Sequence, residues 1–292
     1  MSEPTDAPVP VGFIGLGNIG GPMAKRLIDW PGGLTVCDVS PDATKDFADA
    51  GVPVVATAAE VAANALVISV MVRDDAQVLD VLDGEHGILR TARPGTVVAI
   101  HSTIESDTPA KLAEIAGAKD VLIVDAPVSG GFMGAYDGTL AFLLGGDDEA
   151  IDKVREPFGR MATLVAHFGP LGAGTQAKLT RNLITYASYV AVGEAMRIAE
   201  AAGLDLGKLG DVVRHSDKVT GGPGSVMVRS TMTPFGPDDP LRPPFLHGAQ
   251  LGQKDLSLVA VLGAEVGVDT PVAVQAKALL DAAMSIDPEL DK

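Results

Sequence analysis

The sequence predicts an α/β fold, in which a doubly wound sheet is followed by an all-helical domain joined to it through a long helix. A glycine-rich turn stands between an apolar strand and a helix near the N-terminus. Strand and helix patterns then alternate over the first half of the chain, as in a parallel sheet with helices on both faces. Residues 175–202 contain no proline and one glycine. They are long enough for a helix of about 42 Å.

The glycine-rich turn predicts a dinucleotide site. Val9, Val11, Phe13 and Ile14 indicate a buried strand, and Met23, Leu27 and Ile28 recur at helical spacing behind Pro22. Gly15 allows the tight turn, Gly17 lets the backbone approach a pyrophosphate, and Gly20 lets the helix pack on the strand. The cofactor-binding residues expected here are Gly15, Leu16, Gly17, Asn18 and Ile19. The alternative is a tight turn with a purely structural role.

The rest of the first half continues the alternation. Ser40 and Pro41 predict the start of one helix, and Thr57 with Glu60 forms a capping box that opens another. Apolar runs predict strands at 34–39, 54–55, 66–71, 96–100, 122–124, 140–144 and 163–165.

The second half contains helix patterns and no strand pattern. Residues 169–174 predict a loop, and Gly203 ends the long helix. Further helices are expected at 206–215, 255–266 and 272–283, and the five prolines of 231–244 predict an extended loop. We therefore expect a dinucleotide-binding domain at 1–168, with a flexible start at 1–8, and a helical substrate and dimerisation domain at 169–292.

Composition excludes several classes of function. The 22 basic and 38 acidic residues give a formal charge of −16, which disfavours nucleic acid and anionic membranes as partners. Cys37 is the only cysteine, so no intrachain disulfide is possible. No apolar run is long enough to span a bilayer, and residues 1–8 lack the features of a targeting segment. The five histidines show no ligand spacing, so no metal site is expected. These features predict a cytoplasmic protein.

Asp38 indicates which dinucleotide is bound. It lies 18 residues after Gly20, where a carboxylate can accept both ribose hydroxyls of an adenosine. It would repel a 2′-phosphate, and no arginine follows it. We therefore expect NAD rather than NADP. The alternative is a helix-capping or solvated aspartate.

Three later segments carry candidate chemistry. Ser129, Gly130 and Gly131 follow a predicted strand and can form a concave anion site for a substrate carboxylate, although an ordinary turn is the better interpretation from spacing alone. Lys178 and Asn182 are four apart on the long helix and share one face. A desolvated lysine beside a cationic nicotinamide can shuttle a proton, whereas most lysines are simply solvated. Lys254 precedes Asp255 at the predicted start of a helix, and the two are either pocket or surface residues.

In this order and spacing, the segments at 12–24, 125–131, 169–182 and 254–256 resemble the β-hydroxyacid dehydrogenase family, as does Ser102-Thr103. The resemblance implies a Rossmann-type domain, a C-terminal domain of the 6-phosphogluconate dehydrogenase type, and dimers or tetramers formed by the helical domains. It implies that Lys178 is the catalytic acid/base, that Ser129, Gly130 and Gly131 bind the substrate carboxylate, and that Asn182 and Lys254 complete the pocket. Met71 and Thr103 would lie by the cofactor, as would Lys254. His101, which precedes Ser-Thr, departs from the family pattern and is expected to alter the pocket.

The resulting functional hypothesis is a reversible, NAD-dependent oxidation of a small 3-hydroxy carboxylate to the semialdehyde or oxo acid. One alternative is a semialdehyde reductase of the tartronate or succinic type. Imine reductases of this fold generally lack the lysine supplied here by Lys178. The presence of both Lys178 and Asn182 argues against a non-catalytic nucleotide-binding protein. The segment 219–247 matches no subgroup, so the sequence leaves the substrate open.

Overall fold

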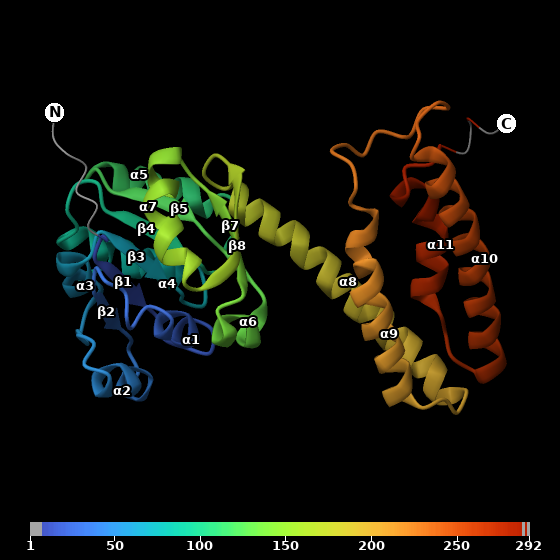
Figure 1. Cartoon of the computed structure of the whole chain (residues 1–292), viewed down its shortest axis with the longest axis horizontal. Coiled ribbons are helices and arrows are strands. Elements are labelled where there is room, and N and C mark those ends of the chain that lie inside the picture. Colours follow the sequence, from blue (N-terminus) through green and yellow to red (C-terminus); the bar gives the residue numbers. More distant parts are fainter. Residues whose placement is uncertain (1–7, 288–289, 291–292) are drawn as a thin grey trace. The chain divides into compact units, whose positions relative to one another are not determined.

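The computed structural model describes residues 8–287 and residue 290. The predicted flexible start at 1–8 therefore lies, except for Pro8, outside the described residues. The chain forms two compact units, residues 1–181 and 182–292, which are described separately below (Figure 1). The predicted domain boundary at 168/169 stays a prediction.

The first unit is built on one eight-stranded sheet with the order β2-β1-β3-β4-β5-β7-β6, in which β8 also pairs with β7. Strands β1 to β5 run parallel to one another, and β7 runs antiparallel to β5. The strands are β1 (Val11–Ile14), β2 (Leu34–Cys37), β3 (Val67–Val70), β4 (Val97–Ile100), β5 (Leu122–Asp125), β6 (Val128–Ser129), β7 (Leu140–Gly145) and β8 (Ala162–Gly169).

The strand order creates a ligand-binding edge. Val54 pairs with Val36 outside β2. If this bridge is counted as the third strand along the chain, the parallel strands, numbered in chain order, lie in the Rossmann order 3-2-1-4-5-6. Successive strands are added on one side of β1 first and then, from β3 onward, on its other side. Ligands bind outside the carboxyl ends of the strands at such a reversal.

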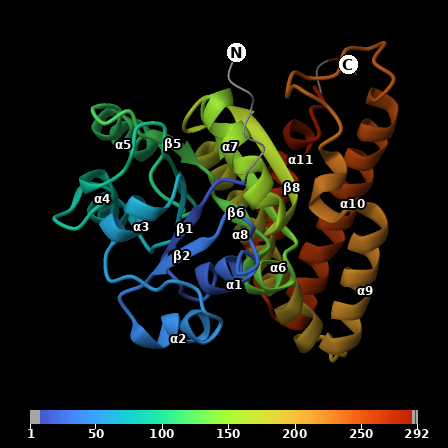
Figure 2. The same cartoon turned by 60° about the vertical axis from the view of Figure 1, so that its left-hand side comes forward.

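Helices cover both faces of the sheet, as predicted (Figure 2). Phe13 of β1 faces a core shared with α1, α2, α6 and α7, whereas Ile14 faces a second core shared with α3, α4 and α5. The helices are α1 (Gly20–Lys25), α2 (Pro41–Asp49), α3 (Ala58–Asn64), α4 (Asp75–Asp83), α5 (Thr108–Gly117), α6 (Gly131–Asp137) and α7 (Asp148–Gly159), with a 3-10 turn at Ile88–Arg90. Successive side chains of β1 thus face opposite sides of the sheet, and each side is covered by helices, which is the doubly wound architecture.

Local signals placed most elements of this unit. The Thr57–Glu60 capping box is present in full. Ser40, in contrast, precedes α2 without a side-chain cap, and the Ala43 N–H donates to the Ser40 backbone carbonyl oxygen at 3.1 Å instead. The two-residue strand β6 was not predicted, since it is too short to show a pattern.

The described part of the second unit contains helices and loops but no strand. Its elements are the end of α8 (Ala173–Ala201), α9 (Leu206–Thr220), a 3-10 turn at Gly222–Val226, α10 (Arg242–Val266) and α11 (Pro271–Ala283). Helices α10 and α11 lie side by side (Figure 1), where a Cβ on Gly252 would overlap Leu280. Buried Glu194 of α8 accepts the backbone N–H groups of Val272 and Ala273, each at 2.9 Å, and so fixes the start of α11.

Two predicted helix limits in this unit were wrong. Helix α10 begins at Arg242 rather than at Asp255, so Lys254 and Asp255 lie inside it. Pro243 and Pro244 lie in its first turn. Proline is tolerated there, because the backbone N–H groups of a first turn have no acceptor within the helix. Helix α9 continues to Thr220, five residues beyond its predicted end. No helix of the described residues is long and apolar enough to cross a membrane.

Candidate functional site

The glycine-rich turn follows β1 at the carboxyl edge of the sheet. Gly15 has a φ of 92°, and a Cβ there would overlap the Met71 carbonyl oxygen. A Cβ on Gly20 would likewise overlap the Gly15 carbonyl oxygen. Gly17 differs, because no atom lies within 4 Å of the place where its Cβ would stand. Two glycines are thus required by packing, whereas the third leaves open space that suits a pyrophosphate.

Asp38 is tied to this turn. Its Oδ2 accepts the Leu16 backbone N–H at 2.6 Å, and its Oδ1 accepts the Ser40 N–H at 2.7 Å. The carboxylate is partly buried and caps no helix, so the helix-capping alternative does not describe it. Two backbone bonds fix its position beside the turn, and lone pairs remain on both oxygens for hydroxyl donors.

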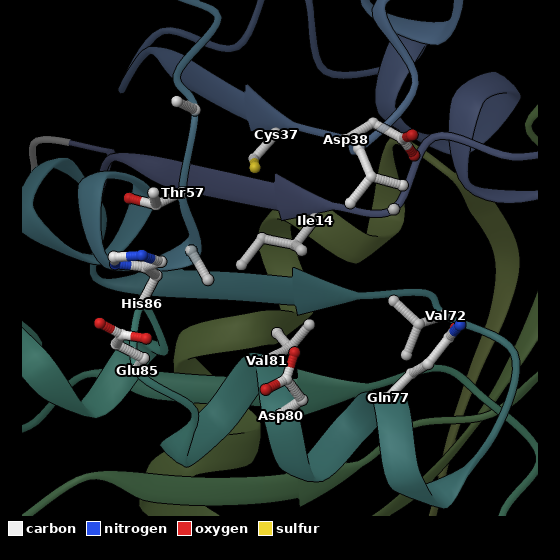
Figure 3. A pocket seen from close by; sticks show the side chains of 14 residues that line it. Ile14, Cys37, Asp38, Thr57, Val72, Gln77, Asp80, Val81, Glu85 and His86 are labelled. Carbon is white, nitrogen blue, oxygen red and sulfur yellow. The ribbon is translucent and has the colours of Figure 1, made fainter.

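A cavity of about 500 Å³ opens beside Asp38 (Figure 3). Its lining combines apolar side chains with three carboxylates and contains no lysine or arginine. The lining residues are Ile14, Gly15, Cys37, Asp38, Val39, Ala56, Thr57, Ala58, Val72, Gln77, Asp80, Val81, Glu85 and His86. Burial, reinforced by Asp38 and Glu60, raises the pKa of the Cys37 thiol, so this group stays protonated. The cavity therefore suits an uncharged ring beside a sugar and disfavours added phosphate.

The loops after β3 and β4 complete this edge. The Ser102 hydroxyl donates to the Val72 carbonyl oxygen at 2.6 Å and accepts the Val72 N–H at 3.1 Å, which joins the two loops. Thr103 follows Ser102 and is exposed. Met71 donates its N–H to the Ile14 carbonyl oxygen at 2.9 Å. Met71 thus lies against the glycine-rich turn, and Thr103 stands at the same edge of the sheet.

The expectation that His101 alters the pocket is wrong. Its ring is 1% exposed and packs among Phe13, Phe142 and Phe158, with ring centroids 5.2 to 6.1 Å apart. Nδ1–H donates to the Ala126 carbonyl oxygen at 2.8 Å, and Nε2 has no partner among the described atoms. Burial lowers the pKa of His101 to about 4, so the ring is neutral. His101 is therefore a core residue. The sequence did not show this, because its aromatic neighbours come from three elements that are far apart in the chain.

Ser129 ends β6, Gly131 begins α6, and Gly130 joins them. Gly130 has a φ of 133° and Gly131 a φ of 63°, both in the region that favours glycine. Gly131 is open, with no atom near the place of its missing Cβ, whereas a Cβ on Gly130 would press on Leu140 at 3.0 Å. Successive glycines of this kind can direct backbone N–H groups toward one anion.

Asp125, at the end of β5, anchors the long helix that carries the candidate lysine. It is fully buried, and its two oxygens accept the N–H groups of Gly172 at 2.7 Å and Thr175 at 2.5 Å. The sequence alone indicates no role for Asp125, since these partners lie 47 and 50 residues away. The one available signal was an acidic residue at the end of an apolar strand.

Lys178 lies one turn further along α8. Its side chain is half-buried, and burial, assisted by Arg181, lowers its pKa from the ordinary value of 10.5. Within the described chain, no carboxylate lies within ion-pair distance of it, so nothing offsets its desolvation. Asn182 follows at i+4 on the same helix face and is partly exposed.

Among the predicted site residues, Lys254 has the surroundings of an exposed surface lysine. It lies in α10, and its Nζ forms an exposed ion pair with Asp255 at 3.0 Å. It belongs to the second unit, so its place beside Lys178 stays a prediction.

Comparison with known proteins identifies the family. The NAD-binding domain of 6-phosphogluconate dehydrogenase, as a family model, matches residues 10–169. A second model, described as the NAD-binding domain of NADP-dependent 3-hydroxyisobutyrate dehydrogenase, matches residues 172–291. The chain belongs to the β-hydroxyacid dehydrogenase family.

Individual members of this family support the assignment. An uncharacterized oxidoreductase of Mycobacterium tuberculosis is 52% identical over 94% of this chain and 93% of the relative. The mitochondrial 3-hydroxyisobutyrate dehydrogenase of Bos taurus is 37% identical over 71% of this chain and 62% of the relative. The chain is therefore an oxidoreductase of the 3-hydroxyacid dehydrogenase type with an NAD(P)-binding domain.

Solved structures agree on the fold of this β-hydroxyacid dehydrogenase. A candidate oxidoreductase from Mycobacterium avium 104 has a TM-score of 0.90 at 49% identity, covering 94% of this chain and 98% of that one. A Mycobacterium tuberculosis 3-hydroxyisobutyrate dehydrogenase, solved with L-serine, has a TM-score of 0.65 at 32% identity, covering 93% and 92%. An imine reductase from Myxococcus stipitatus, at 16% identity and a TM-score of 0.72, shares the fold alone.

Proposed function

We propose that the protein catalyses the reversible, NAD-dependent oxidation of a small 3-hydroxy carboxylate, similar to 3-hydroxyisobutyrate, to the semialdehyde or oxo acid. The observation that carries this proposal is the half-buried Lys178 with its lowered pKa, in a chain of the 3-hydroxyacid dehydrogenase type. A lysine that loses its proton readily can act as a general base near neutral pH.

The proposed substrate site has a binding part and a reacting part. The Ser129 hydroxyl and the backbone N–H groups of Gly130 and Gly131 hold the substrate carboxylate. Lys178 accepts the proton of the substrate hydroxyl at Nζ, and Asn182 orients that hydroxyl by hydrogen bonding. When bound, a nicotinamide cofactor would supply the acceptor for the hydride that leaves the substrate carbon atom. In the reverse direction, Lys178 returns the proton to the carbonyl oxygen.

The preference for NAD over NADP rests on charge. Asp38 stands at the mouth of a cavity that also contains Asp80 and Glu85, and none of its lining residues is basic. A 2′-phosphate placed there would face carboxylates without a compensating cation, which is unfavourable. The open space beside Gly17 would receive the pyrophosphate.

We further propose that the protein acts in the cytoplasm as a homodimer or homotetramer formed through its helical domain. In the second unit, the described fully buried apolar cluster consists of Phe235, Ala249 and Ile286. Large apolar side chains on α8 are nevertheless exposed, including Leu183 at 69% and Tyr186 at 61%. Apolar surface of this extent is typical of an interface.

Initial rates with NAD and NADP on a panel of C3–C6 3-hydroxy acids, including branched and aromatic ones, test the proposal. We expect turnover on at least one acid, with NAD strongly preferred. Turnover on none of the panel with either cofactor would contradict the reaction assignment. A strong preference for NADP would contradict the role of Asp38 alone.

A further inference from the structure

The buried carboxylate of Asp125 is not used in the proposed reaction, yet it is bound where the lysine helix begins. Both of its oxygens accept backbone N–H groups, from Gly172 and Thr175. Among the described residues, no basic side chain forms an ion pair with it. The carboxylate is therefore compensated by N–H groups at the positive end of α8.

The backbone of Asp125 is itself held rigidly. It pairs with Ile100 of β4 on one side and with Gly145 of β7 on the other. A Cβ on Gly145 would overlap Asp125 Oδ1, and a Cβ on Gly174 would overlap the Leu143 carbonyl oxygen. The first turn of α8 thus packs so closely on the sheet that only glycine fits at both contact positions, and the Asp125 carboxylate lies between helix and sheet. This leaves the start of the helix little room to move.

Asp125 also begins the segment that ends in the proposed carboxylate site. Three residues separate it from Ser129, and Ala126 is held by a 2.8 Å bond from its N–H to the Ile100 carbonyl oxygen. On the other side, Thr175 precedes Lys178 by three residues of continuous helix. One side chain therefore joins the segment that would bind the substrate to the helix that would deprotonate it.

We propose that Asp125 is a positioning residue, which holds the first turn of α8 so that the Lys178 amine faces a substrate bound at Ser129–Gly131. This inference rests on the proposed role of Lys178. Asp125 has no part in proton transfer, and its effect passes through the helix. A misplacement of about 1 Å in such a site can reduce turnover by about a hundredfold.

The test compares Asp125→Asn with Asp205→Asn in the full-length protein. Asp205 also accepts a backbone N–H in the first turn of a helix, from Lys208 at 3.0 Å, but α9 carries no proposed site residue. Asparagine cannot accept with its amide nitrogen, so Asp125→Asn loses one of two bonds. Amide hydrogen exchange of 170–180, the Kd for NAD, kcat and the pH dependence of kcat/KM are measured for both variants.

We expect Asp125→Asn to speed amide exchange at Gly172 and Thr175, to lower kcat at least about tenfold and to leave the Kd for NAD nearly unchanged. The acidic limb of kcat/KM for hydroxy-acid oxidation, below which Lys178 is protonated and cannot act as the base, should move to higher pH as the amine becomes better solvated. Asp205→Asn should change none of these. If Asp125→Asn does not fold, Asp125→Ser, which removes the carboxylate without added bulk, takes its place.

Two results would overturn the inference. One is wild-type kinetics in the Asp125 variant. The other is a fall in kcat that matches a loss of folded protein, with the pH limb and the amide exchange of 170–180 unchanged. Full activity of Lys178→Ala would instead contradict the proposed function, which separates the two failures.

Discussion

Acidification should destabilise the first unit through His101. The ring is fully buried among three phenylalanines, and its pKa falls from 6.5 to about 4 in the folded protein. The unfolded chain therefore binds a proton at a higher pH than the folded chain does. Stability is complete above pH 6.5 and is lost as the pH falls from 6.5 toward 4.

The magnitude follows from the two pKa values. One unit of pKa corresponds to about 1.4 kcal/mol, so the full loss is about 3 kcal/mol. Between pH 7.5 and pH 5 the loss is about 2 kcal/mol. Most carboxylates with ordinary pKa values remain charged over this range, which makes the histidine contribution visible.

Urea unfolding followed by Trp30 fluorescence measures this effect. Trp30 is the only tryptophan, is buried in the first unit, and donates its indole N–H to the Val9 carbonyl oxygen at 2.7 Å. We expect the free energy of unfolding to fall by about 2 kcal/mol between pH 7.5 and pH 5. His101→Phe should remove most of this dependence, and His86→Gln, at an exposed position of the same unit, should retain it. Parallel pH profiles for the wild type and His101→Phe would refute the reasoning.

Three further predictions concern the cofactor, the substrate and the assembly. Asp38→Ala should raise the KM for NAD at least about tenfold, because the ribose loses its acceptor; an unchanged KM, measured by initial rates, would contradict this. Gly131→Ala places a side chain at a φ of 63° and should raise the KM for the hydroxy acid, while the Kd for NAD, from fluorescence titration, stays the same; equal changes in both would count against the anion site. Leu183→Glu combined with Tyr186→Glu should shift the mass in analytical ultracentrifugation to that of a single chain, whereas an unshifted oligomer would place the interface elsewhere.

The sequence was most informative where the physical cause was local. The glycine-rich turn depends on contacts among Gly15, Gly20 and the neighbouring strand end, and the capping box depends on Thr57 and Glu60 alone. Strands β1 to β5 are short apolar runs buried on both faces, so their positions followed from composition. The alternation with helices predicted the doubly wound arrangement, whereas the order of the strands came only from the structure.

Features that depend on distant partners could not be predicted. His101 precedes a segment expected at the cofactor, but the rings that enclose it come from β1, β7 and α7. Asp125 acquires its two donors from a loop and a helix about 50 residues later. The start of α10 at Arg242 could not be predicted, because Pro243 and Pro244 are compatible with both a loop and a first helical turn.

The central claim is that Lys178 is the base of a hydroxyacid dehydrogenase. The most direct measurement is kcat for Lys178→Ala on the best substrate of the 3-hydroxy acid panel, together with the Kd for NAD. We predict a loss in kcat of at least about a hundredfold with a nearly unchanged Kd, because the base is removed while the cofactor site remains intact. Wild-type turnover in this variant would contradict the claim.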